Sequence, residues 1–267
     1  MTDKQKLRYC NVKLNHIYHG DRVDVMRTFP EGVIDLTVTS PPYDNLRTYK
    51  GYDFNFEGIA KELYRVTKQG GVVVWVVGDA TIKGSETGTS FRQALYFKDV
   101  CGFNLHDTMI FRKVNPIPQN HNRYEQCFEY MFVFSKGKPK TFNPLLVETK
   151  HGGKVFDWGD RKTVLDVNQA RRHRESDERV VKRYKRRCNI FEYSVGGGNT
   201  GHPAVFPEQL AEDHILSWSN PGDIVLDPMC GSGTTCVMAL KNHRHYIGID
   251  IAEEYVELAR RRVEEVE

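Results

Sequence analysis

Residues 56–77 read FEGIAKELYRVTKQGGVVVWVV, a helix-like pattern followed by an apolar run. Its first half has the i, i+3, i+4, i+7 spacing of an amphipathic helix, with apolar residues at Phe56, Ile59, Ala60, Leu63 and Val66. The pair Gly70-Gly71 then leads into an unbroken apolar run at 72–77. A strand without polar alternation is buried on both faces, which is typical of a parallel sheet covered by helices on both sides. The sequence therefore predicts an α/β fold.

The same alternation continues on both sides of this stretch. The pattern predicts strands at 15–21, 33–40, 223–227 and 245–250, and helices at 23–29, 90–100, 207–218 and 252–265. Segments 103–113 and 127–135 are two strands with no helix between them, which indicates an antiparallel hairpin at one side of the sheet.

The pattern stops between about residues 136 and 200, where Gly, Lys, Arg and Asn are frequent. We expect an inserted recognition region at 136–200 between two halves of one domain, 1–135 and 201–267. Within it, residues 171–187 hold nine Lys or Arg against three acids. Such a run is either a solvated surface or a surface that follows phosphates.

Composition excludes several classes of protein. The 267 residues carry a net charge of +3, 39% are hydrophobic, and no window approaches the ~18 apolar residues of a membrane span. The N-terminus lacks the apolar segment of a signal peptide, so we expect a cytoplasmic protein whose six cysteines stay reduced. No C-x-x-C is present, and we expect no metal site.

One chemical motif is DPMCGSGTT at 227–235, a glycine turn between a strand and a helix. This context suits a nucleotide-like cofactor at a helix N-terminus. The motif is not G-x-G-x-x-G, lacks the P-loop lysine, and does not place Ser232 in G-x-S-x-G. Asp250 ends the next strand, where a carboxylate can accept hydrogen bonds from ribose hydroxyls. The alternative is that Asp250 caps the last helix.

The second motif is Ser40-Pro41-Pro42-Tyr43, at the end of a predicted buried strand. Prolines have no N–H, so this rigid segment offers carbonyl and hydroxyl acceptors, which an exocyclic amine requires. Tyr43 adds a face on which a planar base can stack. The alternative is a turn stiffened by proline. Ligands of parallel sheets bind beyond the carboxyl ends of the strands, so both motifs should share one edge.

Together, these motifs resemble the S-adenosylmethionine-dependent DNA amino-methyltransferases of the permuted β group. The resemblance rests on HGD (19–21), TSPPY (39–43), RYEQCFEYMFVFSKG (123–137), GHPAVFPEQL (201–210), LDPMCGSGTT (226–235) and YIGIDIAEEYVELARRR (246–262). It implies a Rossmann-like, mostly parallel sheet of seven strands with an antiparallel hairpin, and a circularly permuted order of motifs.

The resemblance also implies roles for individual residues. Ser40 and a carbonyl of Pro41 or Pro42 would hold the target amine, and Tyr43 would stack on the flipped base. Asp250 would bind the cofactor ribose and Asp21 would face the adenine. Pro203 and Phe206 would close over the methionine end, which the turn would hold through Asp227, Pro228, Met229, Cys230, Gly231, Ser232, Gly233 and Thr234. Met229 departs from the family, which usually has Phe there.

The implied substrate is double-stranded DNA, with a cognate restriction endonuclease as a possible partner and a monomer or homodimer as the assembly. Ser in place of the Asp of many members favours N4 of cytosine. N6 of adenine, a non-catalytic DNA-binding subunit and a nicotinamide-dependent oxidoreductase are the alternatives. The candidate DNA contacts are cations and an amide of the polar segments: Arg47, Asn120, Arg123, Arg171, Arg172, Arg174, Lys182, Arg183, Lys185, Arg186 and Arg187.

Overall fold

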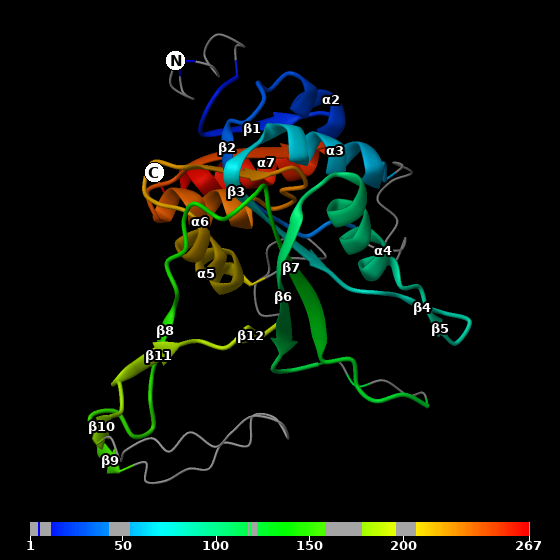
Figure 1. Ribbon diagram of the computed structural model, residues 1–267. Helices are drawn as coiled ribbons and strands as arrows, with labels where there is room; N and C mark the ends of the chain where they lie inside the picture. The colour runs from blue at the N-terminus through cyan, green and yellow to red at the C-terminus, as the bar shows by residue number, and fades with distance from the viewer. Residues whose placement is uncertain are drawn as a thin grey trace. The chain divides into compact units, whose positions relative to one another are not determined.

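A computed structural model describes residues 5, 12–42, 54–116, 118, 122–157, 178–195 and 207–266. The chain forms two compact units. The larger unit combines Met1–Asn143 with Asn189–Glu267, and the smaller unit is Pro144–Cys188. Figure 1 shows the helices and strands of both units.

An eight-stranded sheet forms the centre of the larger unit, in the order β1-β14-β13-β2-β3-β7-β6-β12. Its strands are β1 (His16–His19), β2 (Ile34–Thr39), β3 (Thr67–Val77), β6 (Asn104–Lys113), β7 (Phe128–Ser135), β12 (Ile190–Tyr193), β13 (Ile224–Asp227) and β14 (His245–Asp250). Only β7 runs antiparallel to its neighbours within this sheet. The sheet is therefore mostly parallel with an antiparallel hairpin, as predicted.

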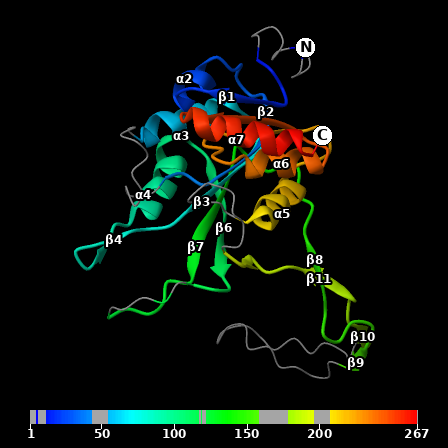
Figure 2. The ribbon, with the colours of Figure 1, turned by 180° about the vertical axis from the view of Figure 1, so that it is seen from behind.

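Helices cover the sheet on both faces, as Figures 1 and 2 show for α2 and α3 on one side and α5 and α6 on the other. They are α2 (Arg22–Arg27), α3 (Phe56–Val66), α4 (Thr89–Leu95) with the π-helical turn η1 (Tyr96–Val100), α5 (Glu208–Trp218), α6 (Thr234–Lys241) and α7 (Glu253–Glu264). The buried stripe of α3 packs with Trp75, Phe97 and Phe134 in one hydrophobic cluster. Val73, Trp75 and Val77 of β3 belong to this cluster, while Val72, Val74 and Val76 are buried on the opposite face, so β3 carries no polar alternation.

The sheet has one strand more than the seven predicted. β12 was missed because it is only four residues long and lies inside the polar segment assigned to the insertion. Its side chains alternate between exposed and buried, with Phe191 and Tyr193 facing inward. The Tyr193 hydroxyl donates a 2.7 Å hydrogen bond to Asp213 of α5. This strand therefore belongs to the main sheet, and the small unit ends before it.

The smaller unit contains two antiparallel strand pairs. β8 (Leu146–Glu148) pairs with β11 (Tyr184–Arg186), and β9 (Val155–Asp157) pairs with β10 (Glu178–Val180). All residues of β8 and β11 are exposed. Backbone bonds from Thr149 to Arg183 and from Gly153 to Val181, both 2.9 Å, connect the two pairs. The described part of this unit is thus held by backbone pairing rather than by a large core.

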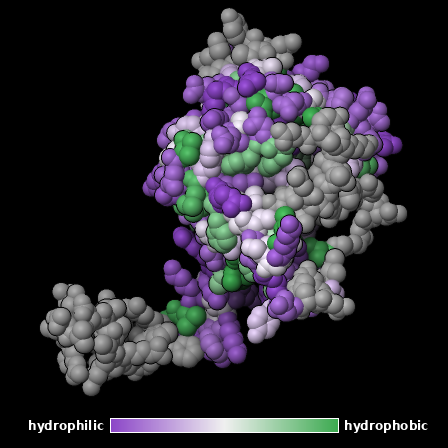
Figure 3. Space-filling model, turned by 90° about the vertical axis from the view of Figure 1, so that its right-hand side faces the viewer, coloured by the Kyte–Doolittle hydropathy of each residue, from purple (hydrophilic) through white to green (hydrophobic). Residues whose placement is uncertain are grey.

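None of the helices in the described ranges has the length and apolar character that crossing a bilayer would require. On the described part of the face in Figure 3, hydrophilic residues predominate and hydrophobic residues occur in small groups.

A short hairpin, β4 (Thr81–Ile82) and β5 (Ser85–Glu86), follows β3 and was not predicted, because each strand has only two residues.

Replacing Tyr193 by Phe removes the buried hydrogen bond between β12 and Asp213. We expect the free energy of unfolding to fall by about 1–3 kcal/mol, because Asp213 keeps a buried carboxylate with one donor fewer. Urea denaturation measures this change. Tyr124→Phe is the matched control, since Tyr124 is 99% exposed. Equal effects of the two substitutions would contradict the role assigned to Tyr193.

Candidate active site

The two motifs meet at the carboxyl ends of neighbouring strands. β2 and β13 pair in parallel through Leu36 with Val225 and Thr37 with Leu226. Just beyond these pairs, the hydroxyl of Thr39 donates to Oδ1 of Asp227 at 2.7 Å. Ser40 and Pro228 directly follow these two residues. The start of the Ser-Pro-Pro segment and the start of the glycine turn therefore lie side by side.

A second contact fixes the same junction. The Thr235 hydroxyl, in the first turn of α6, donates to the carbonyl of Val38 at 3.1 Å. The glycine turn is thus attached to β2 at both of its ends, through Asp227 and through Thr235.

Asp227 is enclosed, with 1% of its surface exposed. Its Oδ1 also accepts from the Met229 N–H at 3.1 Å. Burial raises the pKa of Asp227 to about 6, although the hydrogen bonds from Thr39, Met229 and Thr235 act in the opposite direction. The carboxyl therefore holds the start of the turn through the N–H of Met229, and its pKa of about 6 lies close to neutral pH.

Glycine is required in the turn for two reasons. Gly231 and Gly233 have φ of 48° and 81°, in the left-handed region where a side chain is strained. A Cβ on Gly233 would also lie 2.8 Å from Cβ of Ala259 in α7. The turn is consequently packed against α7, and α6 begins immediately after it.

Asp250 connects the turn to the end of β14. Its Oδ2 accepts from the N–H of Gly231 and its Oδ1 from the N–H of Ala252, both at 2.9 Å. Ala252, not Asp250, is the N-cap residue of α7. Each carboxylate oxygen has two lone pairs, so Asp250 can hold the turn and still accept hydrogen bonds from sugar hydroxyls.

The structure places the other predicted residues as follows. Pro41 is buried, and Ser40 and Pro42 are half-buried. Asp21 caps α2, accepting from the N–H groups of Val23 at 2.8 Å and Asp24 at 3.1 Å. In the turn Met229 is half-buried, whereas the buried residues are Pro228, Cys230, Gly231, Ser232, Gly233 and Thr234. The predicted residues outside the described ranges are Tyr43, Arg47, Asn120, Arg171, Arg172, Arg174, Pro203 and Phe206.

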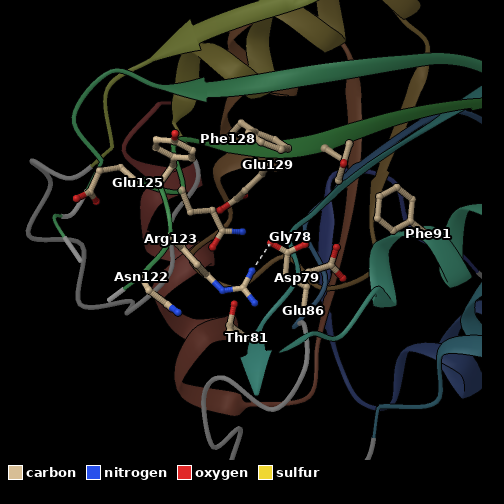
Figure 4. A pocket seen from close by; sticks show the side chains of 13 residues that line it. Gly78, Asp79, Thr81, Glu86, Phe91, Asn122, Arg123, Glu125, Phe128 and Glu129 are labelled. Atoms are coloured by element: carbon tan, nitrogen blue, oxygen red, sulfur yellow. Dashed lines mark ion pairs between the residues drawn. The ribbon is translucent and has the colours of Figure 1, made fainter. Parts of the chain in front are cut away.

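A cavity of about 440 Å³ opens at the carboxyl end of β3, next to β2 in the sheet (Figure 4). Its walls include Asp79, Phe91 and Glu129. Arg123 also lines it, 3.6 Å from Glu86 and hydrogen-bonded to the carbonyl of Gly84. This arginine, a predicted DNA contact, is thus attached to the β4–β5 hairpin.

The remaining predicted DNA contacts that the structure describes lie in the smaller unit. Lys182, Arg183, Lys185 and Arg186 are exposed, and Arg187 is half-buried. Arg183 lies 3.4 Å from Glu148, in an exposed pair that contributes little stability.

Sequence reasoning did not identify three residues that shape the site. Thr39 and Thr235 were inside quoted motifs, but only the structure shows their hydroxyls joining the motifs. Arg262 of α7 donates to the carbonyl of Ser232 at 2.7 Å. Nothing in the sequence distinguishes Arg262 from the two arginines before it.

Replacing Asp227 by Asn removes the titrating group and keeps an acceptor for Thr39. The carboxyl has an ordinary pKa of 3.8 and a pKa of about 6 in the folded protein, so the folded state binds its proton more tightly. Raising the pH through this interval therefore lowers the free energy of unfolding of the wild type relative to the variant, by up to about 3 kcal/mol. Urea denaturation at several pH values measures the difference.

Asp99→Asn, at an exposed position on η1, is the control and should show no such trend. A difference between wild type and Asp227→Asn that is constant with pH would contradict the assignment.

Comparisons with known proteins agree with this geometry. A family model described as DNA methylase, N6_N4_Mtase, matches residues 34–261. The orphan methyltransferase M.BamHII of Bacillus amyloliquefaciens is 57% identical over 240 residues, covering 86% of this chain and 88% of that protein. Two solved structures share the fold. The cytosine-N4-specific PvuII DNA methyltransferase has a TM-score of 0.67 at 22% identity and covers 92% of this chain and 85% of its own.

The M1.HpyAVI–SAM complex has a TM-score of 0.62 at 25% identity, and the match covers 93% of this chain and 98% of that chain. The family model alone spans well over half of the sequence. The chain therefore belongs to the N6/N4 DNA methylase family and is an S-adenosylmethionine-dependent DNA methyltransferase.

Proposed function

We propose that this enzyme methylates the exocyclic N4 amine of cytosine in DNA. The observation that carries the proposal is the hydrogen bond from Thr39 to Asp227, because it makes the start of the motif at Ser40 and the glycine turn neighbours. The support for cytosine is the resemblance of Ser40-Pro41-Pro42-Tyr43 to the motif of cytosine-N4 enzymes, since many family members have Asp in place of Ser40.

On the target side, the flipped base would lie with its amine at Ser40 and its ring on Tyr43. Hydrogen bonds from the amine to the Ser40 hydroxyl and a proline carbonyl draw the nitrogen lone pair out of conjugation with the ring. Flipping costs a few kcal/mol of stacking.

On the donor side, the residues of the turn fit S-adenosylmethionine. Asp250 offers a carboxylate for the ribose, and the side-chain-free backbone of Gly231 and Gly233 allows close approach of the methionine end to the N-terminus of α6. Asp21 would face the adenine, while Pro203 and Phe206 would cover the methionine end. Turn residues Asp227, Pro228, Met229, Cys230, Ser232 and Thr234 complete the proposed cofactor set.

The bound cofactor supplies an electrophilic methyl group on a sulfonium, with a neutral thioether as leaving group. The amine nitrogen would form the new N–C bond while the C–S bond breaks and its electron pair goes to sulfur, and the methylated amine would then lose one proton to solvent water. Ser40 and the proline carbonyl orient the amine for this displacement. No covalent bond to the protein is needed.

DNA recognition is proposed for residues 136–200, through the cations Arg171, Arg172, Arg174, Lys182, Arg183, Lys185, Arg186 and Arg187. Arg47, Asn120 and Arg123 would add contacts from the catalytic side. The exposure of Lys182, Arg183, Lys185 and Arg186 supports phosphate contact. An endonuclease with the same recognition sequence is the proposed biological counterpart.

The reaction is tested by incubating duplex DNA with S-adenosylmethionine carrying a deuterated methyl group and analysing the nucleosides by mass spectrometry. We expect labelled N4-methylcytosine. Ser40→Ala should lower kcat by about tenfold, the effect of one lost hydrogen bond to the reacting group. The exposed Ser85→Ala is the control. Labelled N6-methyladenine would refute the cytosine assignment, and unlabelled DNA from a protein that binds no cofactor would indicate a non-catalytic subunit.

The phosphate contacts are tested by the salt dependence of DNA binding. The logarithm of the DNA-binding constant falls as the logarithm of the salt concentration rises. The double substitution Lys182→Gln with Lys185→Gln should make this negative slope shallower by about 2, close to one for each phosphate that is no longer neutralised. The matched control is Lys61→Gln with Lys98→Gln, two exposed lysines on α3 and η1. Equal slopes for both double variants would show that the basic segment does not contact DNA.

A further inference from the structure

Arg262, near the end of α7, is directed onto the glycine turn. Its Nη1 donates to the carbonyl of Ser232 at 2.7 Å and to the Ser232 hydroxyl at 3.0 Å. The hydroxyl of Thr234 lies 3.3 Å from the same nitrogen. Only 15% of the Arg262 side chain is exposed. One guanidinium thus holds the two residues that flank Gly233.

The other arm of the guanidinium contacts a different helix. Nη2 donates to Oε1 of Glu208 at 2.8 Å. Glu208 is the first residue of α5, where a negative charge interacts favourably with the helix dipole. Arg262 therefore links three parts of the larger unit: α7, the turn before α6, and the start of α5.

The turn needs such support because its backbone is unusual. Two glycines with positive φ lie within three residues, and a glycine-rich segment loses much conformational entropy when it is fixed. Asp250 holds the turn at Gly231, and Ala259 contacts it at Gly233. Arg262 supplies the hydrogen bonds from α7 that restrain Ser232 and Thr234.

Charge alone does not explain this arrangement. Glu208 lies 2.8 Å from Arg262 and 3.9 Å from Lys241, so its carboxylate offsets part of the positive charge beside the turn. The distinguishing property of Arg262 is the direction of its donors. A planar guanidinium can donate to the turn and to Glu208 at once, whereas a lysine ammonium is a single point of charge. The contribution of Arg262 is therefore geometric.

We propose that Arg262 is a positioning residue for the methyl donor, which keeps Ser232 and Thr234 in the conformation that accepts the methionine end of S-adenosylmethionine. This inference rests on the proposed placement of the cofactor at the 227–235 turn. Arg262 acts through the turn and takes no part in the chemistry of transfer. Its loss should therefore affect cofactor affinity more than the rate at saturating cofactor.

The test compares Arg262→Gln with Arg261→Gln, the same change at the exposed neighbouring arginine. Calorimetry with the full chain gives the Kd of S-adenosylmethionine, and kinetics at saturating DNA give KM and kcat. We expect Arg262→Gln to raise Kd and KM about tenfold with a smaller change in kcat, because a hydrogen-bonded charged group is lost. Arg261→Gln should stay within about twofold of wild type.

Two further variants separate positioning from folding. Arg262→Lys should recover only part of the affinity, and Glu208→Gln should weaken binding less than Arg262→Gln, because the bonds to the turn remain. Thermal melting confirms that each variant is folded. If Arg262→Gln fails to fold, Arg262→Lys decides: affinity equal to wild type would overturn the proposal.

Asp250→Asn distinguishes this inference from the proposed function. Weak binding in Asp250→Asn together with normal binding in Arg262→Gln would refute the role of Arg262 alone. Normal binding in both would refute the placement of the cofactor at the turn, and the inference with it. Weak binding in both, with Arg261→Gln unchanged, supports the proposal.

Discussion

The junction of the two motifs is centred on a buried hydrogen bond from the hydroxyl of Thr39 to the carboxyl of Asp227, with a second bond from Thr235 to the carbonyl of Val38 beside it. Parallel strands bring β2 and β13 side by side, but the segments that follow them diverge unless something joins them. In a low-dielectric interior this bond is strong, and leaving either group unpaired is costly. The acceptor segment at Ser40 and the turn at Gly231 are therefore held in one register by the fold itself.

In the rest of the site, too, side chains hold the backbone of the turn in place through hydrogen bonds. Asp250 and Arg262 bind backbone groups of the turn, and Asp227 binds the N–H of Met229. Binding groups held on rigid elements lose little entropy when a ligand arrives. The smaller unit, with exposed strand pairs and exposed cations, has a different character that suits contact with a charged polymer.

Much of the fold could be predicted from the sequence. The helical stripe at 56–66 and the apolar run at 72–77 identify a doubly covered sheet, because periodicity directly reflects burial. The meeting of the two motifs also follows from parallel topology. Strand β12 could not be predicted, since four residues carry too weak a pattern and its burial depends on Asp213 and His214 of α5.

The side-chain network of the site was less accessible. Asp250 was predicted as a cofactor ligand, yet its bond to Gly231 depends on how the glycine turn packs against the end of β14. Arg262 contacts the turn because α7 crosses it at Ala259, a tertiary relation that no local pattern encodes. Arg123 was expected to face DNA, and its attachment to Gly84 depends on a hairpin too short to predict.

A crystal structure with bound S-adenosylhomocysteine shows whether the methyl donor and the amine acceptor share one site. We expect the ribose hydroxyls within about 3 Å of the Asp250 carboxylate, the amino acid end against the 231–233 turn, and the sulfur facing Ser40. A product molecule bound away from the turn, or with its sulfur directed away from Ser40, would contradict this arrangement.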